Sequence, residues 1–164
     1  MSRVVLGIDP GSRATGYGVV RQEGERLRSL AAGVVRPRSS EPLPRRLLAI
    51  YQGLVGQIER FGPEAVAVEE VFFSINARSA LTLGHARGAA LLAAAAHGLP
   101  VHEYSPSEVK SAVVGYGRAE KHQVQQMVRL ILGLAQPPPQ DAADALAVAI
   151  CHCNSWALGG WRRG

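Results

Sequence analysis

The three aspartates of this 164-residue chain stand at only two places. Asp9 follows the apolar run Val4-Val5-Leu6-Gly7-Ile8, and Asp141 and Asp144 open an alanine-rich segment. All other acidic residues are glutamates. Short carboxylate side chains are typical ligands of hard divalent cations, and such cations in a basic protein indicate phosphate chemistry.

The spacing of Asp141 and Asp144 suits a shared site. In a helix, residues three apart lie on one face, with Cβ atoms about 5–6 Å apart. Both would lie near a helix N-terminus, where negative charge is favoured. Two other interpretations stay open: Asp141 and Asp144 could form a dipole-compensating pair on a solvated helix, and Asp9 could simply begin the turn before Pro10-Gly11.

A second acidic position ends another predicted strand. Glu69 and Glu70 directly follow the apolar run Val66-Ala67-Val68. Because neighbouring residues of a strand point to opposite faces of the sheet, only one of the two can meet Asp9. Spacing alone does not say which.

An alternation of strands and helices must bring these acidic residues together. Apolar runs predict strands over 3–9, 14–21, 26–35, 65–71 and 101–104. Helical spacing predicts helices over about 45–61, 76–97, 120–132 and 139–156, and a capping box at Ser105 begins a further helix that Gly115 ends. Pro10-Gly11 suits the centre of a type II turn.

Connection lengths then predict the topology. The first three strands are joined tightly and form an antiparallel meander, whereas helices separate the later strands and make them parallel additions. The expected fold class is therefore α/β, with a mixed sheet flanked by helices. One domain over 1–157 and a flexible tail over 158–164 fit this length.

The charge composition indicates which kind of partner the protein binds. A net charge of +5 and a pI of about 9.8 favour a polyanion. No signal peptide or membrane-spanning run is visible. Cys151-His152-Cys153 has the residue types of a metal motif, but core packing in a reducing cytoplasm is the interpretation we favour.

One alternative concerns the glycines after Asp9. The run from Asp9 to Gly16 could form a phosphate-binding hairpin, as in actin-like and sugar-kinase ATPases. Those proteins carry a duplicated domain, and this chain is too short for two halves and has no internal repeat.

A series of motifs covers about residues 4–153. In chain order they are Leu6-Gly7-Ile8-Asp9-Pro10-Gly11-Ser12-Arg13 with Thr15-Gly16-Tyr17-Gly18, Val68-Glu69-Glu70-Val71-Phe72, Asn76-Ala77, Leu83-Gly84-His85-Ala86-Arg87-Gly88, Val109-Lys110, Val114-Gly115, Ala119-Glu120-Lys121 and Asp141-Ala142-Ala143-Asp144-Ala145-Leu146-Ala147. Together they resemble the RuvC family of bacterial Holliday-junction resolvases.

The resemblance implies an RNase H-like fold and a site of four carboxylates. Its catalytic and metal-binding residues would be Asp9, Glu69, Asp141 and Asp144, with Glu69 chosen because the first acid of the pair matches the family motif. Two Mg²⁺ ions, for which Mn²⁺ would substitute, could activate a water and stabilise a leaving 3′-oxygen.

The resemblance also implies DNA-binding residues. Lys110 and Lys121 match basic positions near the active site, although both could be solvated helix lysines. Phe72, and less so Phe73, could stack on bases or pack in the core. Arg78 and Arg87 are candidate phosphate contacts.

The expected activity is a structure-selective endodeoxyribonuclease of recombination and repair that nicks four-way junctions symmetrically as a homodimer. The helix through Leu81, Gly84, Gly88, Ala89 and Leu92 would form the dimer interface, or else pack on the sheet, and a branch-migration motor would cooperate. The alternatives are a ribosomal-RNA precursor nuclease of related fold, usually shorter and without the Asp-Ala-Ala-Asp ending, and a catalytically silent junction-binding protein.

Overall fold

The computed structural model describes residues 1–70 and 76–158. Its strands are β1 (Ser2–Asp9), β2 (Thr15–Glu23), β3 (Arg26–Val35), β4 (Ala65–Glu69) and β5 (Val101–Tyr104). Its helices are α1 (Leu43–Phe61), α2 (Ala77–Ala96), α3 (Pro106–Val114), α4 (Lys121–Leu132) and α5 (Gln140–Ala157). The predicted elements are all present, with ends shifted by a few residues at most.

The five strands form one mixed sheet in the order β3-β2-β1-β4-β5. β1, β2 and β3 pair antiparallel, whereas β4 lies parallel to β1 and β5 lies parallel to β4. This arrangement confirms the predicted α/β class, because tight hairpins join the antiparallel strands and helices join the parallel ones.

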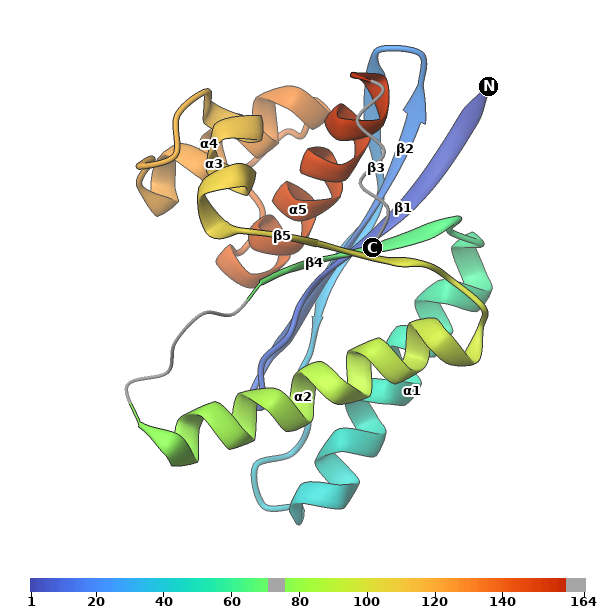
Figure 1. Ribbon diagram of the computed structural model, residues 1–164, viewed down its shortest axis with the longest axis vertical. Coiled ribbons are helices and arrows are strands. Elements are labelled where there is room, and N and C mark those ends of the chain that lie inside the picture. The colour runs from blue at the N-terminus through green and yellow to red at the C-terminus, as the bar shows by residue number, and fades with distance from the viewer. Residues whose placement is uncertain (71–75, 159–164) are drawn as a thin grey trace.

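Helices cover both faces of the sheet. α1 and α2 lie on one face, and α3, α4 and α5 lie on the other (Figure 1). The strands alternate accordingly: Leu6 and Ile8 of β1 pack with α1 and α2, whereas Val5 packs with α5. β1 and β4 are apolar on both faces because each face is covered.

Glycines let α5 lie unusually close to the sheet. A Cβ on Gly16 would come within 2.0 Å of the Asp141 carbonyl oxygen, and one on Gly7 within 2.0 Å of the Ala145 carbonyl oxygen. A Cβ on Gly18 would come within 2.6 Å of the Leu146 side chain. The glycines of β1 and β2 therefore set the distance between α5 and the sheet.

Local signals at several boundaries behave as predicted. The Ser105 hydroxyl accepts from the Glu108 N–H, and the Glu108 carboxylate accepts from the Ser105 N–H, which is the reciprocal capping box expected at the start of α3. Gly115 ends α3 with a φ of 100°. β4, however, ends at Glu69 rather than at residue 71.

The type II turn predicted at Pro10-Gly11 is wrong. That turn needs a positive φ at its third residue, and Gly11 is not among the glycines with positive φ. Glycine is required there for space, because a Cβ on Gly11 would come within 2.4 Å of the Ala14 carbonyl oxygen. The Thr15 hydroxyl closes this loop by donating to the Gly11 carbonyl at 2.8 Å.

The Cys151-His152-Cys153 segment packs in the core, as expected. Both thiols are free and buried. The His152 ring is 2% exposed and its Nδ1 lies 2.6 Å from the Tyr104 hydroxyl. Burial lowers the pKa of His152 to about 4, which keeps the ring neutral. Among the described helices, none has both the length and the apolar character needed to cross a membrane.

Candidate active site

Asp9 is the last residue of β1 and faces α5. Alternate residues of a strand share a face, so Asp9 lies on the same side as Val5 and Gly7. Because Gly7 and Gly16 permit close approach, the first turn of α5 comes up against the end of β1. A strand residue and a helix more than 130 positions later in the chain thus meet at one point.

The three aspartates form a compact group at this point. One carboxylate oxygen of each of Asp9, Asp141 and Asp144 lies within 4.8 Å of the other two. Asp141 and Asp144 are three residues apart on α5 and project together, as their spacing predicted. All three side chains are partly exposed, so the group is open to a ligand.

Glu69 stands at the edge of this group. Its strand, β4, is parallel to β1, and the pairing of Ile8 with Val68 sets Glu69 beside Asp9. Ala67 packs against the α5 side, so Glu69 faces the same way. Glu69, and not Glu70, contributes to the raised pKa of Asp9, although its oxygens lie outside the group of three.

Burial and mutual repulsion make these carboxylates reluctant to ionise. Burial, followed by the charges of Asp144, Glu69 and Asp141, raises the pKa of Asp9 to about 7. Burial also raises the pKa of Asp144 to about 6, and that of Glu69 goes up for the same reason. A divalent cation would remove this repulsion, and oxygen ligands alone suit Mg²⁺ or Mn²⁺.

The charges of the chain's two lysines act on the same site. Lys121 acts to lower the pKa of Asp9, Asp144 and Glu69, and Lys110 acts similarly on Asp144 and Glu69. They come from different helices, since Lys110 lies in α3 and Lys121 begins α4. Both ammonium groups are therefore available to an anion held beside the carboxylates.

The other candidate DNA-binding residues are less uniform. Arg87 is turned inward: its Nη1 donates to the Glu69 carbonyl at 2.8 Å, and its Nη2 lies 2.9 Å from Glu103 Oε1. It thereby ties α2 to the ends of β4 and β5 and supports the backbone of Glu69. Arg78 is exposed in the first turn of α2. Phe72 and Phe73 lie outside the described residues.

Sequence reasoning missed one neighbour of the aspartates. Arg36, just after β3, places its Nη2 4.0 Å from Asp141 Oδ2. Both side chains are well exposed, so the pair contributes little to stability. No local sequence pattern marks Arg36. It reaches Asp141 because β3 pairs with β2, and the end of β3 lies at the same edge of the sheet as the end of β1.

Comparison with known proteins gives consistent matches over nearly the whole chain. One protein-family profile, described as crossover junction endodeoxyribonuclease RuvC, matches residues 5–152. Proteins of that name from Geobacter sp. (strain M21) and Trichlorobacter lovleyi are 52% and 56% identical to it. The first match covers 98% of each chain, and the second covers 94% of this chain and 86% of the other.

Solved structures agree. The chain is similar to the RuvC structure of Thermus thermophilus, with 44% identity and a TM-score of 0.88. It is also similar to the same organism's RuvC in complex with a Holliday junction substrate, with 43% identity and a TM-score of 0.91. Each comparison covers 96% of this chain and 97% of the other. A yeast mitochondrial Holliday junction resolvase, at 15% identity and a TM-score of 0.64, shares the fold.

Proposed function

The chain belongs to the RuvC family of crossover junction endodeoxyribonucleases, and from that premise we propose that Asp9, Glu69, Asp141 and Asp144 bind the metal ions with which it cuts a four-way DNA junction. The observation that carries this proposal is the meeting of three aspartates within 4.8 Å, beside Glu69 and two lysines. Such a group suits a hydrolase of phosphodiesters.

The residues fit divalent cations. Asp9, Asp141 and Asp144 offer only oxygen, and burial together with the charges of neighbouring carboxylates raises the pKa values of Asp9 and Asp144, which a bound cation would offset. Bound there, Mg²⁺ or Mn²⁺ would lower the pKa of the attacking water and neutralise charge on the leaving 3′-oxygen.

The protein's own side chains would orient the substrate. Lys110 and Lys121 would hold the scissile phosphate against the carboxylates, because ammonium groups pair with phosphate oxygens. Asp9, held by β1, and Asp144, held by α5, would keep their oxygens together in the group that binds the metal ions. Water would form the new bond to phosphorus, and the 3′-oxygen would leave with its electron pair and then take up a proton.

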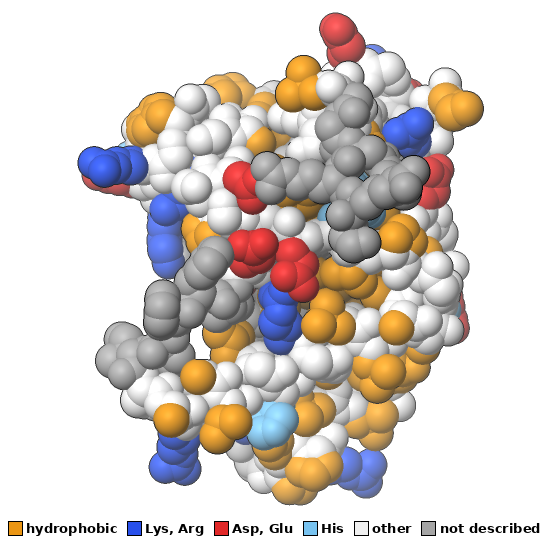
Figure 2. All heavy atoms as spheres, in the orientation of Figure 1, with side chains coloured by type: hydrophobic (Ala, Val, Ile, Leu, Met, Phe, Trp, Pro, Cys, Tyr) orange, Lys and Arg blue, Asp and Glu red, His pale blue; other side chains and the backbone are white. Residues whose placement is uncertain are grey.

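A homodimer fits the face of α2 that no other described element covers. Leu81 and Leu92 are 66% and 60% exposed, and a Cβ on Gly84 or Gly88 would meet nothing within 4 Å. In Figure 2 hydrophobic side chains are spread over the lower part of the molecule, where Figure 1 places α2. This helix packs on α1 through its buried alanines, so the Leu81–Leu92 stripe is left for a second copy.

Two such active sites, related by a two-fold axis, would nick two like strands at symmetric positions. A branch-migration motor that moves the junction would bring suitable sequences to the sites. Neither alternative from the sequence is favoured: the relatives are named as junction endonucleases rather than ribosomal-RNA nucleases, and the complete carboxylate group argues against a silent binding protein.

The test is a comparison of substrates. The protein is incubated with Mg²⁺ or Mn²⁺ and a labelled mobile four-way junction, a linear duplex of the same sequence, or structured RNA. We expect paired, symmetric nicks that yield ligatable duplexes from the junction only. Preferential digestion of RNA would support the ribosomal-RNA alternative, and binding without any cutting would support the silent one.

A further inference from the structure

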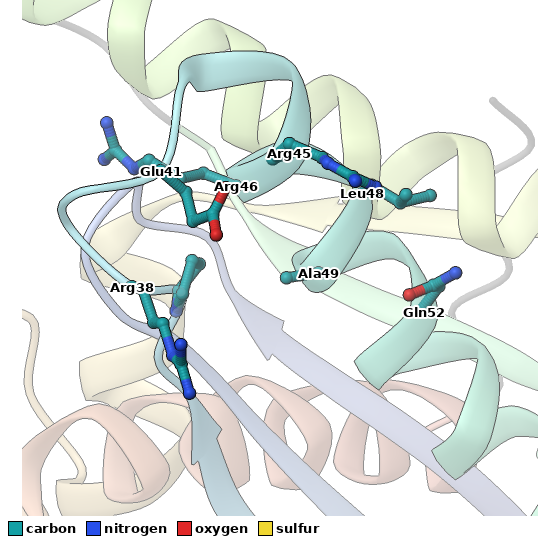
Figure 3. Close-up of a pocket in the computed structure, with 8 residues that line it drawn as sticks. Arg38, Glu41, Arg45, Arg46, Leu48, Ala49 and Gln52 are labelled. Atoms are coloured by element: carbon teal, nitrogen blue, oxygen red, sulfur yellow. The ribbon is translucent and has the colours of Figure 1, made fainter.

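An arginine-lined pocket lies beside the active site but takes no part in the carboxylate group. It encloses about 280 Å³ between the segment that follows β3 and the first turns of α1. Figure 3 shows Arg38 on that segment and Arg45 and Arg46 at the start of α1, with their side chains extending in different directions around the pocket. Its remaining walls are Pro37, Glu41, Leu48, Ala49 and Gln52.

The charges in this pocket are not balanced by the protein. Its lining includes three arginines and one carboxylate, that of Glu41. Within residues 1–70 and 76–158, neither Arg38, Arg45 nor Arg46 makes an ion pair within 4.0 Å. The Nε of Arg46 is buried and has no hydrogen-bond partner there. Such a surplus of positive charge around a hollow suits an anion.

The start of α1 strengthens this preference. Its first turn contains no acidic residue, and no side chain caps it. The helix dipole is positive at this end, so Arg45 and Arg46 add like charge to it, and a bound anion would relieve the repulsion. Backbone donors contribute little, because Pro44 has no N–H and those of Arg45 and Arg46 already bond to the Pro42 carbonyl. The guanidinium groups must therefore make the contacts.

Two short connections link the pocket to the metal-binding residues. Arg46 Nη2 donates to the Ser12 carbonyl at 2.9 Å, and Ser12 lies in the loop that Asp9 begins. Arg36 Nη2 lies 4.0 Å from Asp141 Oδ2, and Arg38 follows Arg36 by two residues, a Cα-to-Cα span of roughly 7 Å at most. A polyanion that places one phosphate at the carboxylates would thus be able to place a second phosphate in the pocket.

We propose that Arg38, Arg45 and Arg46 form a second phosphate site, which grips a backbone phosphate of the DNA other than the one that is cut. The proposal rests on the proposed function, because it takes the junction as the polyanion. Arg38 and Arg45 contact the phosphate oxygens directly. Arg46 holds the Ser12 loop with one nitrogen and completes the positive lining of the pocket.

Binding in the absence of metal separates this site from catalysis. Fluorescence anisotropy with a labelled four-way junction in EDTA, at salt from about 50 to 200 mM, gives the affinity and its salt slope. Arg38→Gln and Arg45→Gln should each weaken binding about 10-fold and reduce the slope by about one unit, and the double variant by about two. The double variant Arg38→Lys/Arg45→Lys keeps both positive charges and should retain the wild-type salt slope.

Arg60→Gln is the matched control. Arg60 is an exposed arginine near the other end of α1, roughly 22 Å from Arg45 along the helix. Its substitution should change neither affinity nor slope. Arg38 and Arg45 are exposed, so the variants should keep the wild-type melting temperature.

Neutral methylphosphonates, placed singly along the junction strands, identify the contact. One position away from the cut should weaken binding of the wild type but not of the Arg38/Arg45 double variant. The second phosphate site would be overturned if the Arg38→Gln and Arg45→Gln variants had the same salt slope as Arg60→Gln. It would also be overturned if no methylphosphonate position affected the wild type and the double variant differently. Wild-type cutting of the junction, measured in parallel with Mg²⁺, reports on the proposed function independently of these slopes.

Discussion

The ionisation of the Asp9 and Asp144 carboxyl groups depends strongly on the fold. Burial is the main cause that raises the pKa of Asp9 to about 7 and the pKa of Asp144 to about 6, well above the value of an ordinary aspartate. The same environment that opposes their charge makes a divalent cation stabilising there. Metal binding should therefore displace protons near neutral pH.

Loss of one ligand charge at constant shape should stop the reaction. We expect Asp9→Asn, Glu69→Gln, Asp141→Asn and Asp144→Asn each to lower the single-turnover cleavage rate by about 100-fold or more, since each removes a group that stabilises the transition state. Junction binding should remain. Glu70→Gln is the control for the strand end and should cut normally; a dead Glu70→Gln with an active Glu69→Gln would show that the other glutamate is the ligand.

Asp9 should also shape the pH dependence of stability without metal. Its folded pKa is about 7 and its ordinary value is 3.8, so the folded state binds more protons between these limits. Stability should fall as pH rises from about 4 to 7 and level off above. Asp9→Asn lacks this contribution. Urea unfolding in EDTA should show wild type losing stability relative to Asp9→Asn over this range, and parallel curves would contradict the raised pKa.

The lysines should act on binding rather than on metal affinity. Lys110→Ala or Lys121→Ala should weaken junction binding and reduce the salt slope by about one unit per lost phosphate contact. In the folded chain the charges of both lysines act on Glu69 and Asp144, which is why the effect is expected. Unchanged affinity, slope and cleavage in both variants would assign them to the solvated surface.

At the scale of elements, the contact between α5 and the β1–β2 hairpin holds the site together. Gly16→Ala would place a Cβ 2.0 Å from the Asp141 carbonyl oxygen and force the first turn of α5 away. We expect a loss of about 1–3 kcal/mol in the free energy of unfolding, typical of overpacking, and a large loss of cleavage. Chemical denaturation and single-turnover cleavage measure the two effects.

Gly56→Ala is the control for this substitution. Gly56 lies in α1, and a Cβ there would meet nothing within 4 Å. Because alanine favours helix, the change should be neutral or stabilise by up to about 1 kcal/mol. A Gly16→Ala protein that is as stable and active as Gly56→Ala would show that α5 tolerates more distance than its packing implies.

For the whole molecule, the exposed face of α2 predicts the assembly. Gly88→Glu should leave the single-chain fold intact, because Gly88 has open space, but would bury a carboxylate without a partner in a dimer. We expect light scattering to show monomers and cutting to lose its symmetric pairing. Gly56→Glu, also at an open helix glycine, should remain dimeric. A wild-type monomer that still makes efficient paired cuts would contradict the dimer.

The order and type of the elements, and the acidic residues to be considered, could be predicted from the amino-acid sequence. Strand and helix periodicity, the capping box at Ser105 and the close spacing of Asp141 and Asp144 are local properties, and each reappears in the structure. Local spacing is sufficient there because the interacting groups are only three or four residues apart.

The way in which distant segments meet could be seen only in the folded chain. Spacing left Glu69 and Glu70 open and only the family resemblance favoured Glu69, whereas the register of β4 on β1 sets Glu69 beside Asp9. The inward turn of Arg87 and the approach of α5 onto Gly16 likewise join segments far apart in the chain. Periodicity tells which residues share a face, but not which faces touch. That depends on strand register and helix packing, which are set by the core as a whole.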